Sequence, residues 1–288
     1  MFGNFPKSLG DVVRWARDRN LRLEEGRARF AQYVVLSSIG ADAQCRRDFV
    51  LKGGNALRLI YQSRRSTRDL DFSVTGDAAD SVAAIRSAFD RAFLPAERRH
   101  GLKVRCQRCQ RNPANPQATM PTYQVSAAYQ FPGDRWFADF ASRPNIPTVV
   151  DLEISFGDLV CESVEVALAD SKSEGLRVCT LNDIIAEKLR SLLQQKIRRR
   201  TRRQDVYDIA RFLGRERDQI DPQRVARFFV EKCRIRNISP TKQSFDDEVK
   251  SRAATEYDHL KDSTGPEFIP FDAAWDAVVN FVNSLDLA

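Results

Sequence analysis

A six-residue segment, "DLDFSV" at residues 69–74, constrains the fold of this chain more than any other feature. Apolar and acidic residues alternate in it with the two-residue period of a β-strand. Leu70 and Phe72 therefore share one face, and Asp69 and Asp71 share the other. Such a strand belongs to a sheet that buries one face and leaves carboxylates on the opposite face.

A second segment repeats this design. In "VVDLEISF", residues 149–156, apolar residues alternate with Asp151 and Glu153. If this strand lies beside the segment that carries Asp69 and Asp71, three or four carboxylates converge on one face. An isolated acidic pair on an exposed strand would simply be solvated, but two such strands are uncommon by chance.

Acidic side chains this close together favour a bound cation. Two acids at i and i+2 on a strand lie roughly 6–7 Å apart and repel each other unless a cation lies between them. Oxygen ligands with no histidine nearby favour Mg²⁺ or Mn²⁺ over zinc. Three or four carboxylates are enough for a two-metal site.

Two glycines lie upstream of the first acidic segment. "DFVLKGG" reads as a short buried strand that enters a glycine turn at Gly53 and Gly54, and "NALRLIYQS", residues 55–63, reads as a helix. Backbone N–H groups at a helix N-terminus suit a phosphate. Most Gly-Gly pairs are simple turns, but a strand, Gly-Gly, a helix and then an acidic strand form a much more specific order.

The composition indicates a soluble chain with a real core. The 288 residues suit one large domain or two modest ones, and 42% of them are hydrophobic. No apolar run approaches the roughly 18 residues of a membrane span. The first twenty residues lack the basic start and apolar block of a secretory signal, so we expect a cytoplasmic protein with no membrane contact.

The cysteines do not form a zinc motif. Only Cys106 and Cys109 make a C-x-x-C pair, and the only histidines are His100 and His259. A structural zinc site needs four ligands, so we expect reduced, partly buried thiols instead.

The distribution of elements predicts an α+β fold, that is, a mixed α/β core with a mixed sheet and helices at both ends. We predict an N-terminal helical segment at 1–45, a core at 46–175 and a C-terminal helical domain at 176–288. The strands are expected at 48–54, 69–74, 102–108, 122–131, 148–156 and 163–168. The helices are expected at 8–16, 26–43, 55–63, 78–93, 181–195, 204–213, 221–234, 243–261 and 271–286.

The positive charge is concentrated in one region. The chain carries a net charge of +7, and residues 186–216 hold ten Lys or Arg against four Asp or Glu. This imbalance favours a polyanionic partner.

The order of motifs resembles the nucleotidyltransferase superfamily, in which Gly-Gly or Gly-Ser precedes an Asp-hydrophobic-Asp strand. The segment "KGGNALRLIYQSRRSTRDLDFS" is similar to the AbiEii/AbiGii toxin family, whose members contain K-G-G-x-A-L and then S-x-R-D-L-D-F. That family also carries a helical lysine followed by R-D-x-x-D-L. Here Lys188 supplies the lysine, and Arg203, Asp205 and Asp208 supply the second motif, although Gln204 separates Arg203 from Asp205. The resemblance covers residues 46–215.

The resemblance implies roles for individual residues. Asp69 and Asp71 would be metal ligands, together with a third carboxylate from Glu153, with Asp151 as its competitor. The triphosphate would meet a further set of residues: Lys52, Gly53, Gly54, Thr67 and Lys188. Asp205 would orient Lys188 or a neighbouring arginine, and Arg68 would face the substrate or neutralise the acids.

Simpler interpretations remain for the helical residues. Lys188 fits a solvated helix face, and Asp205 and Asp208 fit surface ion pairs with nearby arginines.

The implied activity is that of a Mg²⁺-dependent (or Mn²⁺-dependent) nucleotidyltransferase toxin that releases pyrophosphate from an NTP and arrests growth. The basic region favours an RNA acceptor, with the 3′ end of tRNA first, although a protein hydroxyl is also possible. The family implies a separately encoded antitoxin. Two alternatives are a non-catalytic nucleic-acid-binding protein on the same scaffold and a metal-dependent nuclease.

Overall fold

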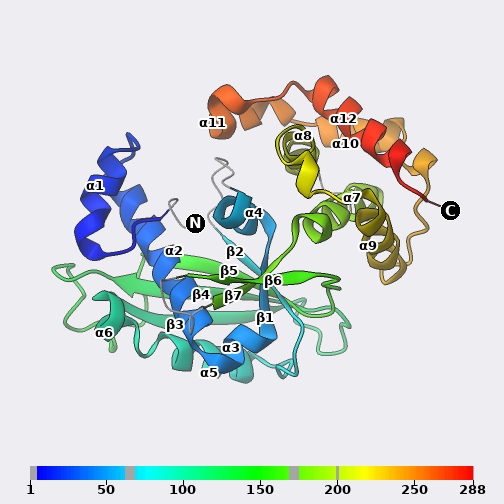
Figure 1. Ribbon diagram of the computed structural model, residues 1–288. Coiled ribbons are helices and arrows are strands. Elements are labelled where there is room, and N and C mark those ends of the chain that lie inside the picture. The colour runs from blue at the N-terminus through cyan, green and yellow to red at the C-terminus, as the bar shows by residue number, and fades with distance from the viewer. Residues whose placement is uncertain (1–4, 62–68, 169–174, 199–200, 288) are drawn as a thin grey trace. The chain divides into compact units, whose positions relative to one another are not determined.

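The computed structural model describes residues 5–61, 69–168, 175–198 and 201–287, which form two compact units (Figure 1). The described residues up to Val178 make the first unit, and those from Cys179 onward make the second. The first unit contains a sheet with helices, and the second is helical. The predicted division into an N-terminal helical segment at 1–45, a core at 46–175 and a C-terminal helical domain at 176–288 stands as a proposal.

The sheet of the first unit is mixed, as predicted. Within the described residues it has seven strands in the order β3-β4-β5-β2-β1-β7-β6. Their bounds are β1 Phe49–Lys52, β2 Leu70–Val74, β3 Lys103–Asn112, β4 Thr122–Gln130, β5 Val149–Ser155, β6 Ser163–Ala167 and β7 Gly175–Cys179. Strand β2 runs antiparallel to β1 and parallel to β5. The two acidic segments are therefore direct neighbours in the sheet.

The apolar face of the sheet is buried under helices. Phe72 on β2 is fully buried, as is Phe49 on β1, whose ring stacks on Phe89 of α5 at 5.5 Å between centroids. Each fully buried aromatic or aliphatic side chain stabilises the fold by about 1.5–3 kcal/mol. In Figure 1, α5 and α6 lie on this side of the sheet and α4 lies on the opposite side. The alternation in the sequence thus fixes which face carries the core.

Six α-helices accompany the sheet in the described part of the first unit. They are α1 Val12–Arg17, α2 Leu23–Ala41, α3 Ala43–Asp48, α4 Gly53–Tyr61, α5 Val82–Phe93 and α6 Ala96–His100. A 3₁₀ turn at Leu9–Asp11 precedes α1.

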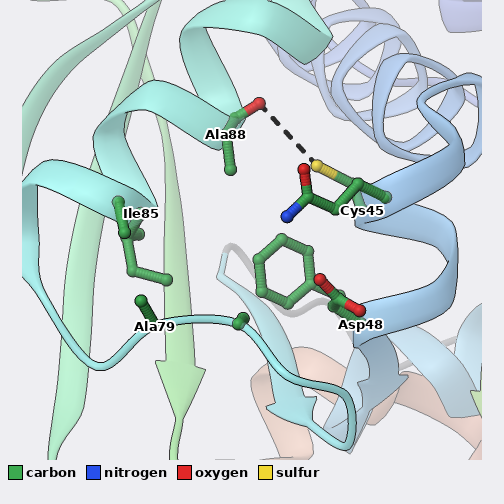
Figure 2. A pocket seen from close by; sticks show the side chains of 9 residues that line it. Cys45, Asp48, Ala79, Ile85 and Ala88 are labelled. Carbon is green, nitrogen blue, oxygen red and sulfur yellow. Dashed lines mark hydrogen bonds between the residues drawn. The ribbon is translucent and has the colours of Figure 1, made fainter.

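A small cavity lies between α3 and α5 (Figure 2). It measures about 30 Å³ and is lined mainly by small side chains, with Cys45 and Asp48 at its wall. That volume admits a water molecule or two and nothing larger. The Cys45 thiol donates to the Ala88 carbonyl at 3.7 Å, and burial raises its pKa. The cavity is therefore a packing defect with an unreactive thiol.

The second unit is a helical assembly. Its helices are α7 Leu181–Arg198, α8 Arg203–Arg215, α9 Pro222–Arg234, α10 Asp247–Ala254, α11 Leu260–Thr264 and α12 Phe271–Ser284. Short 3₁₀ turns lie at Arg217–Gln219, Lys242–Ser244, Tyr257–His259 and Gly265–Glu267. Thr180 caps α7, since its Oγ1 accepts the Asp183 N–H at 3.3 Å. None of the helices in the described ranges has the length and apolar character that crossing a bilayer requires.

Asp42 joins two helices of the first unit. Its carboxylate accepts the backbone N–H groups of Gln44 and Cys45 at the start of α3, at 3.1 and 2.8 Å. The same group pairs with Arg91 of α5 at 2.7 and 3.0 Å. The Arg91 hydrogen bonds lower the pKa of Asp42 from 3.8 to about 2.

We expect Asp42→Ala to lower the free energy of unfolding at pH 7 by about 1–2 kcal/mol, the usual effect of losing a helix cap. Because the folded-state pKa is depressed, the carboxylate stabilises the fold fully above about pH 4 and loses this effect as the pH falls toward about 2. Urea unfolding at a series of pH values measures it. A difference between variant and parent that stays constant down to pH ~2.5 would contradict the assignment.

Candidate active site

Asp71 and Glu153 lie directly opposite each other on adjacent parallel strands. The register pairs Asp71 of β2 with Glu153 of β5. Neighbouring strands lie about 4.8 Å apart, so these carboxylates project side by side. Lys52 pairs with Asp71 on the other side, and Gln124 of β4 pairs with Glu153. One row of polar residues therefore crosses four strands.

The face that carries this row is open. Along β5, Asp151 and Glu153 are exposed while their neighbours Val150, Leu152 and Ile154 are buried. This confirms the alternation predicted for the segment.

The two acids of the D-L-D motif differ in setting. Asp71 lies within β2 and is partly buried, whereas Asp69 is exposed. Asp69 lies in a bend one residue before β2 begins at Leu70, not in the strand itself. The first acid of the motif therefore stands where the chain enters the sheet.

Gly53 lies against the Asp71 carboxylate. Strand β1 ends at Lys52 and α4 begins at Gly53, so both glycines lie in the helix and not at the end of the strand predicted at 48–54. The φ angle of Gly53 is +69°. Only glycine adopts this backbone conformation without strain. A Cβ at this position would overlap the Asp71 carboxylate oxygen and lie 3.0 Å from its Cγ. The diglycine turn and the acidic strand thus form one site.

Lys52 is held by an acid that the sequence analysis did not single out. Its Nζ lies 2.5 Å from the Asp158 carboxylate, in the loop after β5. Both side chains are only 17% exposed. A phosphate that binds Lys52 would compete with Asp158. The predicted triphosphate contacts Thr67 and Arg68 lie outside the described residues.

Asp151 and Glu153 occupy different rows. Asp151 pairs in register with Ser126 and accepts its hydroxyl hydrogen bond at 2.7 Å. Glu153 shares a row with Asp71 instead. The register therefore favours Glu153 as the acidic partner of Asp71.

The chemistry of this row fits a hard cation. Its acidic donors are carboxylate oxygens, with no thiol or imidazole among them, and such donors suit Mg²⁺ or Mn²⁺. The arrangement does not yet amount to a complete ligand set: in the part of the chain that the structure describes, no three His, Cys, Asp or Glu side chains are grouped to hold a metal ion. Asp71 and Glu153 supply two ligands in register, and Asp69 lies at the adjacent strand entrance.

In the second unit, Lys188 lies in a buried ion network. Its Nζ donates to Asp205 Oδ1 at 2.7 Å and to Asp208 Oδ2 at 2.8 Å, which links α7 to α8. All three residues are buried. The solvated-face interpretation of Lys188 and the surface-pair interpretation of the two aspartates are both wrong. Arg203 pairs with Glu256 instead of joining this network.

A match to a family model identifies the family of the chain. The model described as the nucleotidyl transferase AbiEii toxin of type IV toxin–antitoxin systems matches residues 35–280. The chain belongs to the AbiEii family. It is a nucleotidyltransferase toxin of that family, and the match extends beyond the range 46–215 that carries the motifs.

A solved structure shares the fold at low sequence identity. The nucleotidyltransferase toxin MenT4 of Mycobacterium tuberculosis is 20% identical, with a TM-score of 0.51 over 96% of this chain and 89% of that one. JHP933 of Helicobacter pylori is 16% identical, with a TM-score of 0.49 over 89% and 90%. The comparison with curated proteins gives no match.

We expect Gly53→Ala to reduce nucleotidyl transfer at least ~10-fold, because the methyl group displaces the Asp71 carboxylate. The positive φ alone costs roughly 1–2 kcal/mol of stability. Gly133→Ala is the matched control, since Gly133 has φ +85° and none of the described residues places an atom within 4 Å of its Cβ position. Equal losses of activity in the two variants, measured by initial rates beside thermal melting, would show that backbone strain is the whole effect.

Lys188→Met should lower the free energy of unfolding by about 3–5 kcal/mol, because it removes a buried ammonium group that binds two buried carboxylates. Urea unfolding checks this value. Lys196→Met on the same helix removes a more exposed pair with Asp246 and should cost no more than about 1 kcal/mol. A Lys188 variant as stable as the Lys196 variant would rule out a structural role for the network.

Proposed function

We propose that this AbiEii-family toxin transfers a nucleotide from an NTP to the 3′ end of an RNA acceptor, tRNA foremost, and that it requires Mg²⁺ or Mn²⁺. The observation that supports this most is the in-register pair of Asp71 and Glu153 on the open face, with the Gly53 turn packed against Asp71. Metal ligands and a phosphate-binding turn then meet at one point of the sheet.

The carboxylates of Asp69, Asp71 and Glu153 would hold the divalent ions. Bound there, the ions would supply positive charge to the triphosphate and acidify the attacking hydroxyl. The protein itself would contribute by positioning the carboxylates. Because strands hold these side chains in place, little reorganisation is needed when the substrate binds.

The triphosphate would lie along the start of α4. Backbone N–H groups at Gly53 and Gly54 face no side chain of their own and suit phosphate oxygens. Lys52, released from Asp158, would add a cation. The acceptor hydroxyl would attack the α-phosphorus in line and lose its proton to water. Its bond to phosphorus forms as the bond to the bridging oxygen breaks, and pyrophosphate leaves.

The family pattern adds further residues to this proposal. Thr67 and Arg68 would approach the triphosphate from the segment before Asp69. Lys188 is a candidate phosphate contact, and Asp205 would orient it through the 2.7 Å hydrogen bond.

An RNA acceptor accords with the charge of the chain. The net charge is +7, and neutralising phosphates with Lys and Arg releases counterions and favours binding. We further propose that the protein acts in the cytoplasm, arrests growth by modifying its acceptor and is controlled by a separately encoded antitoxin. The six cysteines are free thiols, which suits a reducing compartment.

The test uses each labelled NTP with total tRNA and Mg²⁺. Asp71→Asn and Glu153→Gln should each lower the transfer rate at least ~100-fold, because each removes a carboxylate that would hold the divalent ions. Asp151→Asn should keep most of the activity, since Asp151 lies in another row. The reverse ranking of Asp151 and Glu153 would overturn the choice of third carboxylate.

Other outcomes of the same assay would overturn the proposed reaction. Shortened RNA with no NTP requirement would identify a nuclease. RNA binding without transfer from any NTP would identify a non-catalytic binder. Transfer of the label to a protein instead of RNA would show that the acceptor is a protein.

A further inference from the structure

Asn55 is a buried residue that reaches from α4 to the acidic strand. It is fully buried in the first turn of α4, and its Nδ2 donates to the backbone carbonyl of Asp69 at 2.6 Å. Fourteen residues separate the two in sequence. The hydrogen bond therefore ties the helix that follows the diglycine to the start of β2.

This hydrogen bond holds a part of the chain that the hydrogen bonds between the strands do not reach. The pairing of β2 with β5 begins at Leu70, and its pairing with β1 begins at Asp71. Asp69 precedes both, in a bend, and its side chain is exposed. The Asn55 amide thus holds the backbone of the one predicted metal ligand that lies outside the ladder.

The first turn of α4 contacts both acids of the D-L-D motif. Gly53 packs on the Asp71 carboxylate, and Asn55 binds the Asp69 main chain. These two contacts fix the position of the Asp71 carboxylate and of the Asp69 main chain relative to the turn.

Packing alone does not explain an asparagine at this position. The Oδ1 atom of Asn55 is buried and has no hydrogen-bond partner in the part of the chain that the structure describes. An unsatisfied buried acceptor is costly, and leucine would fill a similar volume without that cost. The amide group of Asn55 contributes through its N–H donor, which hydrogen-bonds to the backbone carbonyl of Asp69.

We propose that Asn55 is a positioning residue that sets the Asp69 carboxylate beside that of Asp71 for binding of a divalent cation. This inference rests on the proposed function, in which both aspartates are metal ligands. Asn55 itself touches neither the substrate nor the metal.

The experiment measures Mn²⁺ binding to the full chain, followed by the EPR signal of the free ion, beside the Mg²⁺ dependence of transfer. Asn55→Leu should weaken Mn²⁺ binding about 10-fold and raise the Mg²⁺ concentration for half-maximal rate by a similar factor. The maximal rate at saturating Mg²⁺ should fall less. Asn55→Ala removes the donor without adding charge and gives the same test if the leucine variant does not fold.

Ile85→Val and Asp71→Asn are the controls. Ile85 is a buried core residue of α5, so its variant loses stability without any link to the acids, and its Mn²⁺ affinity should be unchanged. If both Asn55 variants bind Mn²⁺ as the parent does while Asp71→Asn does not, the positioning role is wrong and the metal site stands. If Asp71→Asn also binds as the parent does, the proposed metal site itself fails.

Discussion

The contact between the Gly53 backbone and the Asp71 carboxylate is the constraint on which the site depends. It exists because β1 and β2 are adjacent and antiparallel. Gly53, the residue after β1, therefore lies beside the first residues of β2. A side chain on residue 53 would separate the turn from the acid. The same pairing places Lys52 in line with Asp71, and the parallel pairing of β2 with β5 adds Glu153 to the row. Local backbone geometry and sheet register thus assemble an acidic face beside a glycine turn, and these are the elements for which we propose cation and phosphate binding.

The second unit shows a different use of charge. Lys188, Asp205 and Asp208 are buried together, and a buried ion network is stable only when every member keeps its partner. The network therefore fixes how α7 packs on α8, whatever further role the family pattern gives to the lysine. It also explains why the second motif carries two aspartates three residues apart: both face the same ammonium group.

The sequence predicted the elements whose periodicity is strong. The acidic strands, their open face and the diglycine turn all followed from alternation and from glycine chemistry. The mixed sheet followed from the order of elements, but its strand order did not, because register between β2 and β5 is a long-range property. Strand β7 was missed because only Leu176 and Val178, either side of Arg177, mark its alternation. Helix α3 was missed because its six residues extend the pattern of α2, and only the extended Asp42 separates them.

Other misses have specific causes. The predicted helix at 243–261 breaks after Ala254, where Glu256 adopts a φ of +55°. A positive φ at a residue other than glycine gives no signal in the sequence. Helix α8 continues through Gly214 because helical packing overrides the propensity of one residue. Asn55 occupies the variable position of K-G-G-x-A-L, so the motif gave no sign of its hydrogen bond to Asp69. Asp158 lies in a loop, and no local pattern connects it to Lys52.

The most direct measurement is a crystal structure of the full chain with Mn²⁺ and a non-hydrolysable NTP, with anomalous scattering used to locate the metal. The account predicts a manganese peak bonded to carboxylate oxygens of both Asp71 and Glu153, with the triphosphate at the N-terminus of α4. Manganese bound elsewhere, with these two carboxylates facing only solvent, would contradict it.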